Sequence, residues 1–151
     1  MTMGYGIDAN MIKVSLWQGA MPPEGTYLSS LGFDVVVFCA QEYQPKASRY
    51  PGMEVIHAPN DDDSSRSITQ QELSTATRAA KKVVRAINQG KKVLVTCLAG
   101  RNRSGLVVAL ALHQLTGMSG EDAVTYIKEC RPYALTNSNF VDILSQIKAI
   151  A

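Results

Sequence analysis

The chain has 151 residues, of which 46% are hydrophobic and 19% are charged. This size and composition are typical of one globular domain with a buried core, and they exclude a disordered, collagen-like or disulfide-stapled chain. The formal net charge of +2 argues against a protein that coats polyanions, because such domains carry a strongly basic excess.

The near-neutral total hides an uneven distribution of charge along the chain. Residues 1–63 carry three basic and eight acidic side chains, whereas residues 64–103 carry nine basic side chains and one acidic one. Residues 104–151 carry three basic and four acidic side chains. The positive charge is therefore concentrated in the middle segment, which also contains the motif that carries the candidate chemistry.

Three cysteines, Cys39, Cys97 and Cys130, form an odd and sparse set without C-x-x-C spacing. This pattern disfavours a disulfide framework or a structural zinc site and is typical of reduced thiols in a cytoplasmic protein. The N-terminus lacks the basic-then-apolar layout of a secretory signal, and the longest apolar run, residues 106–112, is too short to span a bilayer. We therefore expect a cytoplasmic protein without membrane insertion, metal or other cofactor, and no pattern indicates its oligomeric state.

The first half of the chain is predicted to form three strands. Residues 11–17 alternate loosely between apolar and polar side chains, as a strand does. Residues 33–39 form a continuous β-branched and aromatic run, which is typical of a buried central strand. A shorter strand is expected at residues 53–58, and it ends at the polar loop of residues 59–65.

The second half is predicted to alternate helices with one more strand. Thr69 and Glu72 form a capping box that begins a long amphipathic helix, and Gly90 ends it. The other expected elements are a strand at 92–97 and helices at 104–115, at 119–130 and from 138, the last burying Phe140, Ile143, Leu144 and Ile147. We predict an α/β fold, one domain over residues 1–151 with a central, largely parallel sheet of four to five strands flanked by helices. Binding sites of such sheets form at the carboxyl ends of the strands.

The informative motif is Val-Leu-Val-Thr-Cys-Leu-Ala-Gly-Arg-Asn-Arg-Ser-Gly at residues 93–105, where Cys97 and Arg103 lie between a predicted strand and a predicted helix. A loop that wraps at this point turns its N–H groups inward and forms an anion-binding nest, to which the helix adds its positive end. The same field favours the thiolate form of a cysteine, which can attack phosphorus. Arg103 offers a planar fork for two phosphoryl oxygens, and Gly100 relieves crowding in so tight a loop.

The spacing of Cys97 and Arg103 is a weak signal by itself. Cys39 and Cys130 have Pro45 and Thr136 at the same offset, so an arginine there is not a general property of the cysteines in this chain. The alternative is that Cys97 is a small buried core residue. The preceding strand, the internal glycine, the following Ser-Gly and the apolar helix together favour the catalytic interpretation.

The chain resembles the dual-specificity phosphatase family of the cysteine-dependent protein tyrosine phosphatase superfamily, over nearly its whole length. Residues 93–105 are similar to the family's phosphate loop, and Arg131-Pro132 with Asn137 and Phe140 is similar to the segment that follows it. Residues 12–19 resemble the opening strand of the family. The resemblance implies a metal-free, two-step phosphatase mechanism on phosphotyrosine and phosphoserine or phosphothreonine in proteins.

The resemblance also implies roles for individual residues. Cys97 is expected to form a phosphocysteine, Arg103 to stabilise the transition state and Ser104 to ease departure of the thiolate in the second step. The phosphate would be bound by the loop of Leu98, Ala99, Gly100, Arg101, Asn102 and Arg103. One position departs from the family, because Thr96 stands where a histidine usually orders the loop and tunes the thiolate. We expect the threonine hydroxyl to fill that role only in part.

A general acid is expected in the cluster Asp61, Asp62 and Asp63, which lies 34 to 36 residues before Cys97 and directly after a predicted strand. Clustered carboxylates raise one another's pKa, which favours a protonated member. The family often shows Ile-Pro-x-x-Asp here, which points to Asp62, whereas other members show Asn-Asp, which points to Asp61. Both stay candidates, with Asp62 preferred.

Two other functions compete with protein dephosphorylation. Asn102 before the loop arginine resembles the RNA 5′-phosphatase branch of the superfamily, and Arg101 adds charge where a polyphosphate end or a phosphoinositide would bind. Against RNA, the sequence offers no obvious aromatic platform for stacking bases. The remaining alternative is a phosphate-binding module without turnover, which the presence of nucleophile, arginine and candidate acid disfavours.

Overall fold

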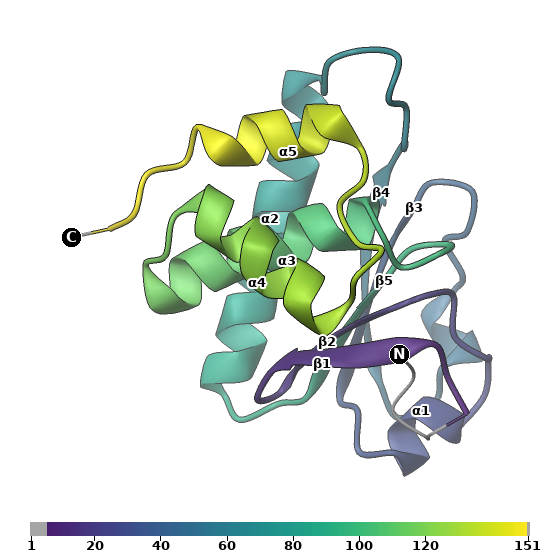
Figure 1. Ribbon diagram of the computed structural model, residues 1–151. Coiled ribbons are helices and arrows are strands. Elements are labelled where there is room, and N and C mark those ends of the chain that lie inside the picture. The colour runs from purple at the N-terminus through teal and green to yellow at the C-terminus, as the bar shows by residue number, and fades with distance from the viewer. Residues whose placement is uncertain (1–5, 151) are drawn as a thin grey trace.

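Five strands form one mixed sheet in a computed structural model that describes residues 6–150 (Figure 1). In chain order they are β1 (Ala9–Lys13), β2 (Leu16–Gly19), β3 (Val35–Ala40), β4 (Glu54–Asn60) and β5 (Val93–Thr96). The spatial order is β1-β2-β5-β3-β4, and every neighbouring pair is parallel except β1 and β2. The predicted α/β fold with a largely parallel sheet is confirmed. Residues 1–5, which contain most of the N-terminus examined for a secretory signal, lie outside the described range.

The prediction of one strand over residues 11–17 is wrong, because the chain turns back in the middle of it. β1 and β2 form an antiparallel hairpin in which Lys13 pairs with Leu16, and Ser15 in the turn has a φ of +71°. Two-residue hairpin turns are usually recognised in a sequence by Asn-Gly or a similar pair, and Val14-Ser15 is not such a pair. The apolar alternation continues across the turn, so the pattern alone reads as one strand.

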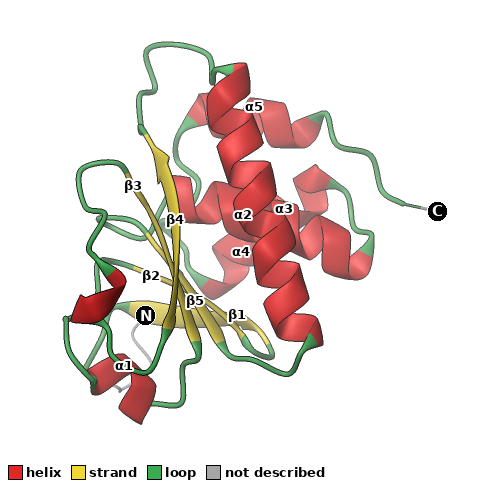
Figure 2. Ribbon diagram, turned by 180° about the vertical axis from the view of Figure 1, so that it is seen from behind, coloured by secondary structure: helices red, strands yellow, loops and turns green. Residues whose placement is uncertain are grey.

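Four helices cover one face of the sheet, as Figure 2 shows. They are α2 (Gln70–Asn88), α3 (Arg103–Thr116), α4 (Gly120–Cys130) and α5 (Ser138–Ser145). The predicted capping box of α2 is present, since the Thr69 side chain accepts from the Glu72 N–H and the Glu72 carboxylate accepts from the Thr69 N–H. Of the residues predicted to be buried by the last helix, Phe140 and Leu144 are buried, while Ile143 and Ile147 are only partly covered. In the described part of the chain, no helix is long and apolar enough to span a membrane.

The opposite face of the sheet is covered by shorter elements that the sequence did not predict. The single-turn helix α1 (Tyr27–Ser30) and a 3₁₀ turn (Ala47–Arg49) lie there, over a second apolar layer. Residues alternate between the layers along β3: Val35 and Val37 join the core beneath the four helices, whereas Val36 and Phe38 join the other. All six residues of β3 are buried, which confirms the predicted central strand.

Because β3, β4 and β5 are parallel, their carboxyl ends meet at one edge of the sheet. Three loops leave from this edge: one after Ala40 that carries Glu42, one after Asn60 that carries the three aspartates, and one after Thr96 that carries Cys97. The fold thus brings together three segments that are well separated in the chain, at the place where parallel sheets bind ligands.

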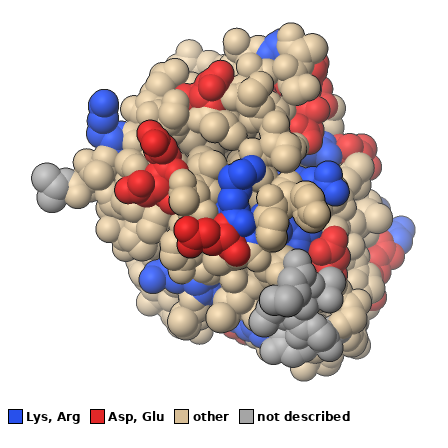
Figure 3. Space-filling view, in the orientation of Figure 1, with Lys and Arg blue, Asp and Glu red and all other residues tan. Residues whose placement is uncertain are grey.

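The basic middle segment does not gather at this edge. Arg101 and Arg103 belong to the loop after β5, whereas Lys82 and Arg85 of α2 line a separate cavity of about 380 Å³ against the first half of β4. On the face seen in Figure 3, basic side chains lie among acidic ones rather than in one continuous surface. The charge excess of residues 64–103 is therefore only in part a property of the candidate site.

Candidate active site

The segment from the end of β5 to the first residue of α3, residues 97–103, has the carbonyl groups of residues 98–101 tied to the surrounding scaffold. The Arg131 guanidinium donates from Nη2 to the Ala99 carbonyl at 3.0 Å and from Nε to the Gly100 carbonyl at 2.6 Å. Backbone N–H groups of Met21 and Leu135 bind the carbonyls of Leu98 and Arg101 at 3.1 and 3.0 Å. We call residues 97–103 the phosphate loop.

A buried glutamine on β2 completes this fixation. Gln18 is fully buried and donates from Nε2 to the Gly100 carbonyl at 3.1 Å, and the same Nε2 lies 3.3 Å from Ser104 Oγ. Because the carbonyl and the N–H of one peptide unit point in opposite directions, outward carbonyls leave the following N–H groups facing the inside of the loop. Such converging N–H groups form an anion-binding nest, and the N-terminus of the fourteen-residue helix α3 adds its positive end.

Gly100 is the position at which the loop requires glycine. Its φ is +68°, in the left-handed region that residues with a side chain rarely adopt. A Cβ there would lie 2.6 Å from the Ala20 nitrogen and 2.6 Å from Arg131 Nη2. The close approach of β2 and Arg131 to the loop is therefore possible only without a side chain, as the sequence predicted.

Cys97 lies at the bottom of the phosphate loop with 6% of its surface exposed. Its Sγ is 3.2 Å from Ser104 Oγ, the group predicted to assist the second step. The expected contribution of Thr96 to loop order is not found, because its hydroxyl donates to the Val37 carbonyl at 2.7 Å, within the sheet. Fixation of the loop carbonyls comes from Gln18 and Arg131 instead, and neither was predicted to have this role.

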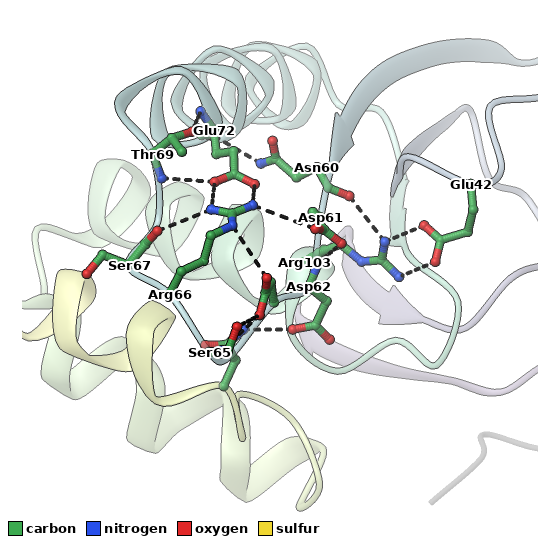
Figure 4. Close-up of polar contacts among 12 residues, drawn as sticks. Glu42, Asn60, Asp61, Asp62, Ser65, Arg66, Ser67, Thr69, Glu72 and Arg103 are labelled. Atoms are coloured by element: carbon green, nitrogen blue, oxygen red, sulfur yellow. Dashed lines mark hydrogen bonds and ion pairs between the residues drawn. The ribbon is translucent and has the colours of Figure 1, made fainter.

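Arg103 lies buried beside the loop, with a carboxylate from the loop after β3 across its fork (Figure 4). Both terminal nitrogens bind Glu42, with Nη2 at 3.2 Å from Oε2, and Nη1 also donates to the Asn60 carbonyl at 3.1 Å. Hydrogen bonding to Arg103 holds the pKa of Glu42 below its usual value, so the pair is ionic at neutral pH. The buried Nε has no partner within the described residues and remains available to a ligand.

The three aspartates after β4 have different surroundings. Asp61 and Asp63 both face Arg66, at 3.6 and 3.5 Å, and Arg66 also binds Glu72 of α2 through two hydrogen bonds of 2.8 and 3.0 Å. Figure 4 shows Arg66 between Glu72 and the aspartates of this loop, while Arg103 pairs with Glu42. Hydrogen bonding to Arg66 lowers the pKa of Glu72 to about 2, which keeps this anchor of the loop ionised.

The expectation that clustering raises the pKa of these aspartates is wrong for Asp63. Hydrogen bonds from the side chain and the N–H of Ser65, at 2.6 and 2.8 Å, lower the pKa of Asp63. Asp62 differs from its two neighbours because it turns towards the phosphate loop. Its two oxygens accept hydrogen bonds from the amide groups of Asn102, at 3.0 Å, and Asn137, at 2.8 Å.

A second cavity, of about 250 Å³, adjoins the outer side of the phosphate loop. Arg101 and Tyr133 are among its lining residues, and the Arg101 guanidinium carbon lies 5.8 Å from the centroid of the Tyr133 ring. Tyr133 is 72% exposed. The sequence argument that no aromatic platform is present is therefore corrected, because the fold places an exposed ring beside the loop.

The buried cysteine, the arginine and the aspartate turned towards the loop are arranged as expected for a phosphatase of the protein tyrosine phosphatase type. The family model "Dual specificity phosphatase, catalytic domain" matches residues 16–150. The chain belongs to this family.

Individual relatives agree with this assignment. "Putative tyrosine phosphatase 123R" of Invertebrate iridescent virus 6 is 33% identical over 89 residues, which are 59% of this chain and 61% of the viral protein. The chain thus matches about three fifths of that relative's length. Among solved structures, human DUSP28 is 24% identical with a TM-score of 0.75, covering 91% of this chain and 90% of its own. PTPMT1 in complex with PI(5)P is 20% identical with a TM-score of 0.78, covering 91% and 92%. These two structures share its fold.

Proposed function

We propose that this protein hydrolyses phosphomonoesters of tyrosine, serine and threonine in proteins through a phosphocysteine at Cys97. The observation that carries the proposal is the phosphate loop, in which the carbonyls of residues 98–101 are tied outward around a buried cysteine. A nest of N–H groups at a helix N-terminus favours both a phosphate dianion and a thiolate. We further propose that the protein works in a reducing compartment such as the cytoplasm, where that thiol stays reduced.

In the first step the Cys97 thiolate attacks phosphorus. The S–P bond forms as the P–O bond to the leaving group breaks, and Asp62 gives its proton to the leaving oxygen. Arg103 binds two equatorial oxygens of the transferring group, for which its free Nε and one terminal nitrogen are suited. Glu42 holds the remaining part of the guanidinium in the plane that this contact needs.

In the second step a water attacks the phosphocysteine. Asp62, now ionised, takes the proton of the water, the S–P bond breaks, and the thiolate leaves. The Ser104 hydroxyl is suited to assist, because its oxygen accepts from Gln18 Nε2 and its hydrogen is free to donate to Cys97 Sγ at 3.2 Å. Inorganic phosphate is then released, and the enzyme returns to its starting state.

Phosphoinositide hydrolysis is the second candidate function. The Arg101–Tyr133 cavity next to the phosphate loop could take a second anionic group of the substrate, which a phosphotyrosine lacks and a phosphoinositide carries. The fold neighbour PTPMT1 was crystallised with PI(5)P. The structure weakens the argument for RNA that the sequence drew from Asn102. The amide group of this residue donates to Asp62 and is therefore already engaged within the protein.

The test of both candidates is turnover without metal. We expect the purified protein to release phosphate from an aryl phosphate and from phosphotyrosyl and phosphothreonyl peptides equally well with and without EDTA. The panel includes a phosphoinositide and a 5′-triphosphorylated RNA at matched salt. A phosphoinositide preferred over both peptides would favour the second candidate, an RNA preference would contradict both, and binding without turnover would indicate a phosphate-recognition module.

The assignment of the acid is tested by three matched substitutions. We expect Asp62→Asn to lower kcat/KM for a substrate with a poor leaving group by about 10²-fold or more, because the leaving oxygen then departs unprotonated. Asp61 and Asp63 face Arg66 instead of the phosphate loop. We therefore expect Asp61→Asn and Asp63→Asn to change kcat/KM by less than about 5-fold. Three equal small losses would show that the acid lies elsewhere.

A further inference from the structure

Two buried asparagines hold Asp62 from segments that are distant in the chain. Asn102 belongs to the phosphate loop and is 8% exposed, while Asn137 precedes α5 and is 2% exposed. Their amide nitrogens donate to Asp62 Oδ2 and Oδ1 at 3.0 and 2.8 Å. Both carboxylate oxygens are therefore engaged, and the side chain has one orientation that satisfies both partners.

The orientation of each amide group is set by other contacts. Asn137 Oδ1 accepts from the N–H groups of Asn139 and Phe140 at 3.0 and 3.4 Å, which caps α5. Asn102 Oδ1 accepts from the Asn137 N–H at 2.9 Å. Since the oxygens are bound by backbone donors, both NH₂ groups must face Asp62. The cap of α5 thus fixes the donors that position the carboxylate.

The two amide groups fix the position of the Asp62 carboxylate and offer no acceptor for its proton. An amide NH₂ group only donates, so neither asparagine can accept the proton of a protonated Asp62, which stays available to a leaving oxygen. The other two aspartates lie against a guanidinium instead. A displacement of about 1 Å in a reacting group costs about 10²-fold in rate, so fixation of the carboxylate has a measurable value.

We propose that Asn102 and Asn137 are positioning residues that hold Asp62 over the phosphate loop and thereby set the activity towards substrates with poor leaving groups. The proposal rests on the proposed function, in which Asp62 is the general acid. The alkoxides of phosphoserine and phosphothreonine are poor leaving groups, so hydrolysis of these esters depends on the acid. Hydrolysis of activated aryl phosphates does not, because their phenolates leave without a proton. The pair would therefore decide how well the enzyme acts on phosphoserine and phosphothreonine relative to activated esters.

The experiment compares Asn137→Ser with wild type on two substrates, phenyl phosphate and dinitrophenyl phosphate. Serine retains a capping oxygen for α5 but removes the NH₂ donor. We expect kcat/KM for phenyl phosphate to fall about 10- to 100-fold, with less than about 2-fold change for dinitrophenyl phosphate. The ratio kcat/KM is used because it reports the first chemical step and not hydrolysis of the phosphocysteine.

Asn139→Ala is the matched control. Asn139 donates from its side chain to the Ser64 carbonyl at 2.9 Å, so it contacts the same loop but not Asp62. This variant should leave the ratio between the two substrates unchanged. Combining Asn137→Ser with Asp62→Asn should add no loss to that of Asp62→Asn alone, because an absent acid cannot be misplaced.

The possible outcomes distinguish failure of the proposed function from failure of the positioning role of the two asparagines. No turnover by the wild-type protein, or an Asp62→Asn variant insensitive to the leaving group, would contradict the proposed function itself. An active enzyme with a leaving-group-sensitive Asp62→Asn would confirm that function. The positioning role would be overturned if Asn137→Ser then lowered kcat/KM equally for both substrates, lowered it for neither, or behaved like Asn139→Ala.

Discussion

Replacing Cys97 by serine is expected to reduce kcat for an aryl phosphate by at least about 10⁴-fold. A serine hydroxyl is a far weaker acid and nucleophile than a thiol, and its neighbour at 3.2 Å is the Ser104 hydroxyl, which is no base. Serine differs from cysteine by one atom, so the loop and its N–H groups should keep their geometry. We therefore expect inorganic phosphate to raise the Tm of the variant at least as much as that of the wild-type protein.

The other two cysteines provide the contrast. Burial raises the pKa of the Cys39 thiol well above its usual value, and burial also raises the pKa of Cys130. Neither environment favours a thiolate, so Cys130→Ser, at a half-buried site where the thiol faces the Ile12 carbonyl, should retain full activity. Turnover that survives Cys97→Ser, or disappears in Cys130→Ser, would contradict a mechanism through Cys97.

The parts of the fold that sequence patterns predicted are those in which the signal is local. The capping box of Thr69 and Glu72 and the continuous apolar run of β3 lie within a few residues, and the structure contains both. The hairpin of β1 and β2 was missed because a two-residue turn without glycine or asparagine leaves the alternation uninterrupted. Helix α1 has four residues, too few for any helical period to show.

In the candidate site, too, the residues of the local motif were predicted and the distant residues that hold the loop were not. Cys97, Gly100 and Arg103 lie within seven residues, and their chemistry was predicted from this motif together with the strand before it and the helix after it. The groups that fix the loop come from far along the chain, with a sequence separation of 82 between Gln18 and Gly100 and of 31 between Gly100 and Arg131. A contact of this kind depends on strand order and helix packing, which no local pattern encodes.

Glu42 and Asn137 illustrate what a stronger topological argument could have found. Glu42 follows the buried strand β3, and the rule that ligands bind at the carboxyl ends of parallel strands applies to it as it does to the aspartates. Asn137 was noted only as part of a family-like segment, and its position as the cap of α5 was open to prediction. Its contact with Asp62 required the packing of α5 against the loop after β4.

The second large effect is expected for Arg103→Lys, which should lower kcat for an aryl phosphate by about 10³-fold or more. Lysine keeps the charge and can still pair with the exposed Glu42 carboxylate, so the substitution does not leave that carboxylate unpaired. What it removes is the planar fork, in particular the buried Nε that has no partner within the described residues. A point charge binds the ground-state dianion and the transition state similarly, so KM should change much less than kcat.

Arg101→Lys is the matched control for this substitution, because it makes the same exchange two residues earlier in the same loop. The Arg101 guanidinium faces Tyr133 outside the nest, so this variant should retain activity towards a simple aryl phosphate within about 3-fold. Equal losses in the two variants would mean that the loop responds to any change of arginine, not to loss of the fork. A Tm for Arg103→Lys close to that of the wild-type protein, together with the loss of kcat, would assign the effect to the transition state, where the geometry of the Arg103 guanidinium is required.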